Sequence, residues 1–310
     1  MTIKGVILDR DSLGDDLDFS GLTNIAEWEF FASTEPKDTQ KRIEEADIVL
    51  TNKVIINQTH MQQSQKLKYI GILATGTNNV DLDAAEKNGI NVDNVTNYCS
   101  ESLAQHWLCL ALNLYTSAYR YHQDVAAGKW SESPFFCRLD YPIRTLANQT
   151  LVIVGYGTLG KAVEKIAKAF GINVLIAEHP NSSPRAGRVA FLDGLSRADI
   201  ISLHCPLTPA TENLIAKETI ASMKDRCFII NTARGPLINE KDLLNALRSG
   251  KVAGAALDVL TTEPPPPDHI LPRNTRDLNL IITPHIAWAT KESRQLLLDK
   301  TTQQIAKFLN

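Results

Sequence analysis

The sequence predicts an α/β protein of two domains, each built around a parallel sheet. Its 310 residues are enough for two domains at roughly 150 residues apiece. Short apolar runs alternate with amphipathic stretches along the chain, which is typical of parallel strands covered by helices on both faces. An apolar run that ends at Val154 is followed by three spaced glycines, as where a strand turns into a helix at a phosphate-binding loop.

The first hundred residues contain one series of alternating elements. We expect strands at 6–8, 28–31, 48–51, 69–73 and 90–95, and helices at 38–46, around 58–65 and at 83–88. A long helix is predicted from 102 to about 127, followed by an irregular, aromatic-rich segment at 129–141. This series accounts for the first sheet.

A second series begins at Leu151. We expect strands at 151–154, 174–177, 200–204, 228–231, 255–259 and 280–283, and helices at 159–169, 192–198, 216–222, 240–249 and 291–309. No unit of 20–50 residues repeats, which argues against a solenoid or a propeller.

The composition excludes several classes of protein. Hydrophobic residues make up 44% of the chain and charged residues 22%, which argues against disorder, collagen and coiled coil. The net charge of −3 argues against a nucleic-acid partner, which would need a basic surface. The five cysteines are scattered without a CxxC pair, so we expect reduced thiols and no metal site. With no signal-peptide pattern and no apolar run of ~20 residues, we expect a cytoplasmic protein that does not contact membranes.

The glycine pattern is the strongest local signal of a cofactor site. Gly155, Gly157 and Gly160 follow a strand and open a helix. In such a loop the first glycine permits the turn, the second lets the backbone approach a pyrophosphate, and the third lets helix and strand pack closely. Glu178, at the end of the next strand, stands about 20 residues further on, where a carboxylate binds the ribose hydroxyls. This favours NAD over NADP, although the nearby basic residues His179, Arg185 and Arg188 could accept a 2′-phosphate.

Three further residues follow later strands. They are Arg234, Glu263 and His285. Ligands gather at the carboxyl ends of strands in open α/β sheets. An arginine suits a substrate carboxylate, and a histidine exchanges protons near neutral pH. A carboxylate on the second ring nitrogen would orient that histidine, so the set suits reduction of a 2-keto acid.

The same segments resemble a known family. Motifs at 155–160, 202–208, 231–235, 255–259, 263–264 and 283–285 occur in the order seen in the D-isomer-specific 2-hydroxyacid dehydrogenases. Segments 136–146 and 284–289 are most similar to the glycerate dehydrogenase (hydroxypyruvate reductase) subgroup. The resemblance implies two Rossmann-like domains with the active site in the interdomain cleft. Residues 1–98 with 287–310 would form a flavodoxin-like substrate-binding domain, and residues 99–286 the NAD-binding domain.

The resemblance also implies roles for individual residues. Arg234 would bind the substrate carboxylate, His285 would be the general acid and base, and Glu263 would pair with it. The substrate-binding loop would include Thr75, Gly76, Thr77 and Asn79. The cofactor residues would be Ser102, Gly155, Tyr156, Gly157, Thr158, Leu159, Gly160, Glu178, His204, Cys205, Pro206, Thr211, Thr232, Ala233 and Asp258. Asp258 would hold the nicotinamide carboxamide, the other reading being a strand-end cap.

The implied activity is reversible hydride transfer between NAD(H) and a small D-2-hydroxy acid. D-Glycerate/hydroxypyruvate is the first expectation, with glyoxylate as a further substrate. D-Lactate, 3-phosphoglycerate and a non-catalytic NAD(H)-sensing corepressor remain alternatives. The family resemblance also implies a homodimer, with the long helix and the segment 130–141 at its interface.

Overall fold

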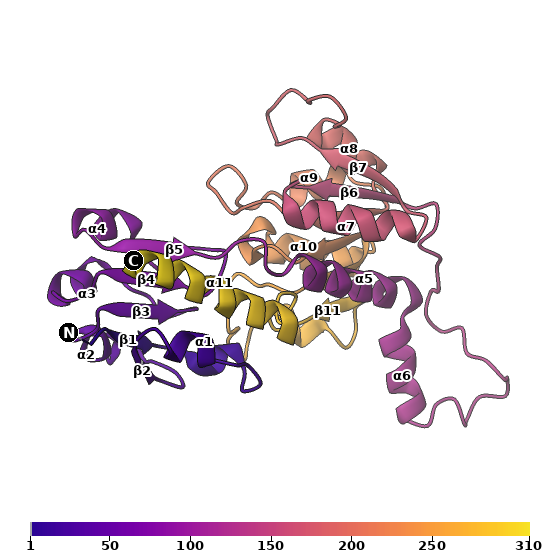
Figure 1. Ribbon diagram of the computed structural model, residues 1–310. Coiled ribbons are helices and arrows are strands. Elements are labelled where there is room, and N and C mark those ends of the chain that lie inside the picture. The colour runs from indigo at the N-terminus through magenta and orange to yellow at the C-terminus, as the bar shows by residue number, and fades with distance from the viewer. Residues whose placement is uncertain (1) are drawn as a thin grey trace. The chain divides into compact units, whose positions relative to one another are not determined.

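The computed structural model describes residues 2–310. They form two compact units, here called unit 1 (residues 2–99 and Ala289–Asn310) and unit 2 (Ser100–Trp288). Each unit has one parallel sheet with helices on both faces (Figure 1). The predicted fold class, two α/β domains with parallel sheets, is therefore confirmed.

Unit 1 contains a five-stranded sheet in the order β2-β1-β3-β4-β5. Its strands are β1 (Lys4–Ile7), β2 (Glu27–Phe30), β3 (Ile48–Thr51), β4 (Tyr69–Ile72) and β5 (Asn91–Asn94). Its helices are η1 (Arg10–Leu13), α1 (Ser20–Thr23), α2 (Thr39–Ile43), α3 (Gln58–Gln63), α4 (Leu82–Lys87) and α11 (Lys291–Leu309). The strand order reverses between β1 and β3, as in flavodoxin-like sheets.

Alternation along these strands sends side chains to two separate layers. Val49 and Ile70 pack in one cluster with Ile43 of α2, Met61 of α3 and Ala84 of α4. The other face meets the C-terminal helix α11: the rings of Tyr69 and Phe308 lie 5.0 Å apart. The end of the chain therefore completes the core of the sheet that its beginning forms.

Unit 2 contains a six-stranded sheet in the order β11-β10-β9-β8-β6-β7. Its strands are β6 (Thr150–Val154), β7 (Asn173–Ala177), β8 (Ile200–Leu203), β9 (Cys227–Asn231), β10 (Val252–Leu257) and β11 (Leu280–Ile282). Its helices are α5 (Ser100–Thr116), α6 (Ala118–Ala126), α7 (Thr158–Ala169), α8 (Phe191–Arg197), α9 (Lys217–Ser222), η2 (Gly235–Leu237), α10 (Glu240–Ser249) and η3 (Pro272–Asn274).

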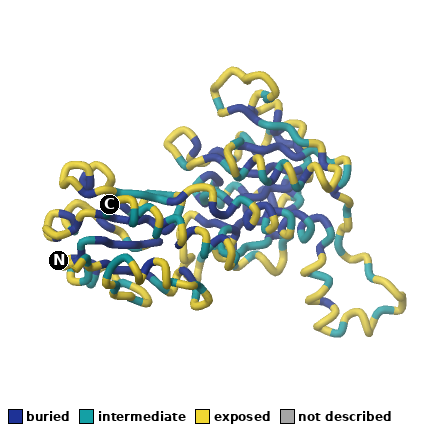
Figure 2. The backbone as a smooth tube through the Cα atoms, viewed as in Figure 1, coloured by how far each residue is buried: buried dark blue, intermediate teal, exposed yellow. Residues whose placement is uncertain are grey.

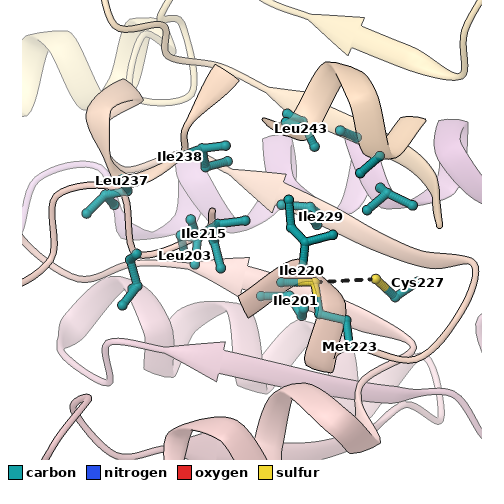
Figure 3. Close-up of a cluster of buried hydrophobic side chains, with 14 of the residues drawn as sticks. Ile201, Leu203, Ile215, Ile220, Met223, Cys227, Ile229, Leu237, Ile238 and Leu243 are labelled. Carbon is teal, nitrogen blue, oxygen red and sulfur yellow. Dashed lines mark hydrogen bonds between the residues drawn. The ribbon is translucent and has the colours of Figure 1, made fainter. Parts of the chain in front are cut away.

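Two buried layers sandwich this sheet. Leu151 and Ile153 face α5 and α7, whereas Val152 and Val154 face α8, α9 and α10. Figure 3 shows the second layer, in which the Cys227 thiol lies 3.8 Å from the Met223 sulfur. Helices thus cover both faces of the sheet, and the candidate site lies along the carboxyl ends of its strands.

The predicted long helix at 102–127 is wrong in one respect, because two helices occupy the region. Ser117 separates α5 from α6 and adopts a left-handed φ of +54°, which an α-helix does not tolerate. Its hydroxyl donates to the carbonyl of Pro142, 3.2 Å away. α6 and the segment after it project from the sheet of unit 2, and most of their surface is exposed (Figures 1 and 2).

No helix within residues 2–310 is long and apolar enough to cross a membrane.

Candidate active site

The predicted site residues of unit 2 share one edge of its sheet. The last residues of the six strands stand in register across the sheet: Ala177, Val154, Leu203, Asn231, Leu257 and Ile282. The residues directly after them are Glu178, Gly155, His204, Thr232, Asp258 and Thr283. Neighbouring strands lie about 4.8 Å apart, so the strand order brings these residues into one row.

The three glycines of the loop 155–160 differ in what surrounds them. Gly155 has a φ of +95°, and a Cβ there would lie 2.4 Å from the backbone nitrogen of Cys205. A Cβ on Gly160 would lie 2.4 Å from the carbonyl oxygen of Gly155. A Cβ on Gly157 would meet nothing within 4 Å. Two glycines therefore close the loop onto protein, and the third borders open space.

These surroundings fit a dinucleotide. Helix α7 begins at Thr158, so the N–H groups of Thr158, Leu159 and Gly160 in its first turn have no intrahelical acceptor and can bind phosphate. Two buried polar atoms that follow β8 and β9, His204 Nδ1 and Thr232 Oγ1, have no hydrogen-bond partner among residues 2–310. Open space at Gly157 beside the free N–H groups of the first turn of α7 is what a pyrophosphate site requires.

Tyr156 lies between Gly155 and Gly157, and three neighbouring side chains contact it. Its hydroxyl bonds to the Glu164 carboxylate of α7. Lys161 Nζ and the Arg188 guanidinium lie 5.7 Å and 6.0 Å from its ring centroid. The ring is thereby fixed against the first turns of α7.

Glu178 is almost wholly enclosed, with 3% of its side chain exposed. Arg185 binds it with two hydrogen bonds of 2.6 Å, and Arg188 adds one of 3.2 Å. The paired Arg185 guanidinium holds the pKa of the Glu178 carboxyl well below its usual range, and the backbone N–H of His179 contributes to the same shift. The predicted ribose-binding carboxylate is therefore ionised and already bound to arginine.

The loop after β8 contains the next predicted cofactor residues. Burial lowers the pKa of His204 to about 4, and its Nε2 bonds to Ser202 Oγ at 2.7 Å. Burial raises the pKa of the Cys205 thiol to about 11, which makes it a neutral group at physiological pH. Thr211 donates to the carbonyl of Pro206 at 2.7 Å and so closes the loop on itself.

Arg234 stands on a tight turn after β9. The Asn231 side chain accepts from the Ala233 N–H at 3.0 Å and donates to the Arg234 carbonyl at 2.9 Å. A Cβ on Gly235 would lie 2.0 Å from the Leu260 carbonyl atoms, so only glycine fits. Among residues 2–310 the Arg234 guanidinium has no carboxylate partner, which leaves its charge available to a substrate.

His285 and Glu263 are joined by a side-chain hydrogen bond. Nδ1 of His285 lies 2.7 Å from Oε2 of Glu263, with 26% and 35% of their side chains exposed. The other Glu263 oxygen accepts from the Leu260 N–H at 2.9 Å. Because Nδ1 is engaged, Nε2 is the ring nitrogen that can exchange a proton with a bound molecule.

The Asp258 carboxylate organises the turn that contains His285. It accepts from Thr283 Oγ1 at 2.5 Å and from the N–H groups of Ile286 and Ala287 at 3.0 and 2.8 Å. Burial alone would raise the pKa of Asp258, but hydrogen bonds from His106, Thr283 and the two amides lower it below the ordinary value. These contacts match the strand-end cap, the other reading of Asp258, and leave part of one oxygen for another donor.

Sequence reasoning missed His106 of α5. Its Nε2 lies 3.0 Å from Thr283 Oγ1 and 3.5 Å from Asp258 Oδ1. Ser102, a predicted cofactor residue on the same helix, donates its hydroxyl to the Ala287 carbonyl at 2.7 Å. The available signal was the i, i+4 spacing of Ser102 and His106, which places both polar side chains on one face of the predicted helix.

The predicted substrate loop belongs to unit 1, between β4 and α4. Thr75 Oγ1 donates to the Val95 carbonyl at 3.1 Å, and Asn79 Nδ2 donates to the Val54 carbonyl at 3.2 Å. Within the described chain, the backbone N–H groups of Gly76 and Thr77 have no acceptor. The side chains thus brace the loop and leave main-chain donors unused.

Comparison with known proteins identifies the family. Residues 108–287 match the NAD binding domain of the D-isomer specific 2-hydroxyacid dehydrogenases. The chain is 41% identical to a hydroxypyruvate reductase from Blautia hydrogenotrophica over 99% of this chain and 97% of the relative. It is 40% identical to a glycerate dehydrogenase from Methylorubrum extorquens over 100% and 97%.

Solved structures agree with these relatives. A protein from Thermus thermophilus superposes with a TM-score of 0.87 at 29% identity, over 99% of this chain and 97% of the other. D-Lactate dehydrogenase from Escherichia coli superposes with a TM-score of 0.82 at 26% identity, over 99% and 97%. The predicted family and the predicted use of NAD are confirmed. This chain belongs to the D-isomer specific 2-hydroxyacid dehydrogenases, enzymes that act on CH–OH groups with NAD.

Proposed function

We propose that this protein catalyses the reversible, NAD(H)-dependent reduction of hydroxypyruvate to D-glycerate and also reduces glyoxylate. The observation that carries the proposal is the 2.7 Å pair of His285 and Glu263 at the ends of β11 and β10, one strand from the turn of Arg234 on β9. The two relatives that match the whole chain at 40–41% identity are named for this substrate pair.

Each residue has a distinct role in the proposed reaction. When bound at the loop 155–160, NADH would supply the hydride for reduction of the carbonyl carbon. The His285 Nε2–H gives its proton to the carbonyl oxygen, which becomes the hydroxyl group. Glu263 keeps the imidazolium oriented and stabilises its charge. Arg234 binds the substrate carboxylate through its planar fork, and its charge polarises the adjacent carbonyl.

The substrate loop of unit 1 would add main-chain donors. We assign the free N–H groups of Gly76 and Thr77 to the substrate carboxylate, with Thr75 and Asn79 bracing the loop. Residues 73–80 contain no Lys or Arg, so this loop offers no cation to a phosphorylated substrate. The proposal therefore favours a small, unphosphorylated 2-keto acid over 3-phosphohydroxypyruvate.

Steady-state turnover tests the assignment directly. Purified protein with NADH should reduce hydroxypyruvate and glyoxylate with a kcat/KM well above that for pyruvate or 3-phosphohydroxypyruvate. His285→Ala should lower kcat by about 10²–10⁴-fold and retain NADH affinity. A protein that binds NADH but reduces none of the four acids would instead support a nucleotide-sensing role.

We also propose that two copies associate through the surface of α6 and the following segment. Its apolar side chains are strongly exposed: Tyr119, Val125, Trp130, Phe135, Phe136, Leu139 and Ile143. Phe136 is 91% exposed and Phe135 72%. An exposed apolar patch of this kind marks a protein interface, and a second copy of the chain offers the matching surface.

Light scattering after gel filtration tests the association. The wild-type chain should run as a dimer, and the double variant Phe135→Ser/Phe136→Ser should shift toward the monomer. Phe170→Ser, on a 42% exposed residue just after α7, is the matched control and should leave the dimer intact. A monomeric wild type would contradict this part of the proposal.

We also propose that the enzyme lies in the cytoplasm, because all five cysteines are free thiols. Cell fractionation tests that placement.

A further inference from the structure

The Glu178 carboxylate has no acceptor capacity left for a ribose. Its Oε1 accepts from the His179 N–H, Arg185 Nη2 and Arg188 Nη1, at 3.0, 2.6 and 3.2 Å. Its Oε2 accepts from Arg185 Nε at 2.6 Å and from the Arg185 N–H at 3.3 Å. A carboxylate has about four lone-pair sites, so five donors saturate it. Ribose hydroxyls reach this group only after an arginine leaves.

The two arginines differ in how far their side chains are exposed to solvent. Arg185 is 67% exposed at its side chain, whereas Arg188 is 21% exposed. Arg185 lies in the exposed stretch 181–187. The ends of the loop are fixed, because Glu178 N–H donates to the Val189 carbonyl and Val189 N–H to the Ile176 carbonyl, at 2.8 and 2.9 Å. Arg185 is therefore the partner that can swing away, and Arg188 is the one that stays.

The charge balance at this point is positive. Two guanidinium groups surround one carboxylate, so the loop holds an excess of one positive charge. All three side chains line a cavity of about 180 Å³ together with Gly155 of the phosphate loop and Pro206. An unpaired Glu178 would repel a 2′-phosphate, whereas the arginine pair offers donors with the geometry that phosphate oxygens accept.

We propose that Arg185 and Arg188 admit a 2′-phosphorylated nucleotide at this subsite, so that the protein uses NADP(H) as well as NAD(H). With NAD(H), Arg185 turns toward solvent and Glu178 accepts from the ribose hydroxyls. With NADP(H), Arg185 exchanges the carboxylate for the 2′-phosphate, and Arg188 keeps Glu178 neutralised. Arg185 is thus a specificity-determining residue. The inference rests on the nucleotide site of the proposed function and revises the preference for NAD over NADP that Glu178 predicts from the sequence.

Nucleotide binding without any 2-keto acid tests this inference. Fluorescence titration with NADH and NADPH, and competition with 2′,5′-ADP, give dissociation constants that do not depend on turnover. The wild type should bind NADPH within about tenfold of NADH. Arg185→Ala/Arg188→Ala should weaken NADPH and 2′,5′-ADP at least tenfold and leave NADH unchanged or tighter. Glu178→Gln should tighten NADPH relative to NADH.

Arg197→Ala is the matched control, since Arg197 pairs with Asp193 on the surface of α8 at 3.1 Å. It should leave both dissociation constants unchanged and so exclude a general charge effect. Wild type that binds NADH but binds NADPH more than 100-fold more weakly would overturn the inference and leave the proposed function intact. An unchanged ratio in the double arginine variant would also overturn it. Failure to bind either nucleotide would refute the nucleotide site itself.

Discussion

His285 donates its backbone N–H to the carbonyl oxygen of Asp258 at 2.9 Å. The same aspartate binds the N–H groups of the next two residues, Ile286 and Ala287, through its carboxylate. His285 has a left-handed φ of +55°, which costs a non-glycine residue about 1–3 kcal/mol. Asp258 therefore holds the histidine in a conformation that the chain would otherwise avoid.

Asp258→Asn should remove part of the support that holds His285 in this conformation. An amide NH₂ would replace one acceptor oxygen and face an N–H donor, so the unfolding free energy should fall by about 1–3 kcal/mol. Turnover of hydroxypyruvate should fall further than the affinity for NADH, because His285 loses its position. Urea unfolding and steady-state kinetics measure the two effects.

The pH dependence of that variant provides a second check. The folded-state pKa of Asp258 lies below its ordinary value. The stability it contributes is therefore present above about pH 4 and is lost as pH falls through the folded-state pKa. The gap in stability between wild type and Asp258→Asn should narrow at acid pH. A constant gap between pH 3 and pH 7 would contradict the contribution of the ionised carboxylate.

Glu263→Gln should separate orientation of the histidine from its charge. The amide can still accept a hydrogen bond from Nδ1–H, but it no longer stabilises an imidazolium. We expect kcat for hydroxypyruvate reduction to fall about 10²-fold with little change in KM or in NADH affinity. Glu218→Gln, on an exposed residue of α9, is the matched control. Full activity in Glu263→Gln would exclude the pair from catalysis.

Much of the candidate site at the strand ends of unit 2 could be predicted from the sequence, because the motifs that mark it are local. The runs ending at Val154 and Asn231 are apolar and are bounded by glycine or by polar residues, so strand ends and the residues after them could be placed. Strand order was not predictable, since it depends on packing between distant segments. It is the order β11-β10-β9 that makes neighbours of the turns containing His285, Glu263 and Arg234.

The errors and omissions have two physical causes. Ser117 breaks the predicted helix through a hydroxyl bond to Pro142, 25 residues away. His106 reaches Thr283, 177 residues away. Glu178 stands where a ribose-binding acid is expected. Whether its carboxylate can accept from a ribose depends on where the exposed loop places Arg185. The first two depend on contacts between residues far apart in the chain, and the third depends on the conformation of an exposed loop. The periodicity of the sequence predicts neither.

His204 should make the enzyme less stable in mild acid. Its folded-state pKa is about 4, below the ordinary value of about 6.5. A lowered histidine pKa means that protonation favours the unfolded chain, so stability is complete above about pH 6.5 and falls as pH drops toward 4. Linkage gives a loss of roughly 2 kcal/mol by pH 5.

Urea unfolding of His204→Gln should show a flatter profile between pH 7 and pH 5 than wild type. His122→Gln, on an exposed histidine of α6, should follow the wild-type curve and so account for general effects of acid. Parallel curves for wild type and His204→Gln would show that burial of this ring does not govern acid stability.

Gly157→Ala and Gly155→Ala should separate nucleotide binding from folding within one loop. A Cβ on Gly157 meets no atom within 4 Å, so Gly157→Ala should unfold at the wild-type temperature. The same methyl group would occupy the space that a pyrophosphate needs, and NADH affinity should fall at least tenfold.

Gly155→Ala places a Cβ 2.4 Å from the Cys205 nitrogen at a φ of +95°, which should destabilise the fold by about 1–3 kcal/mol or more. Differential scanning fluorimetry with and without NADH distinguishes the two: Gly157→Ala should keep its Tm but lose the shift that NADH produces. A Gly157→Ala protein that is stabilised by NADH as strongly as wild type would place the pyrophosphate elsewhere.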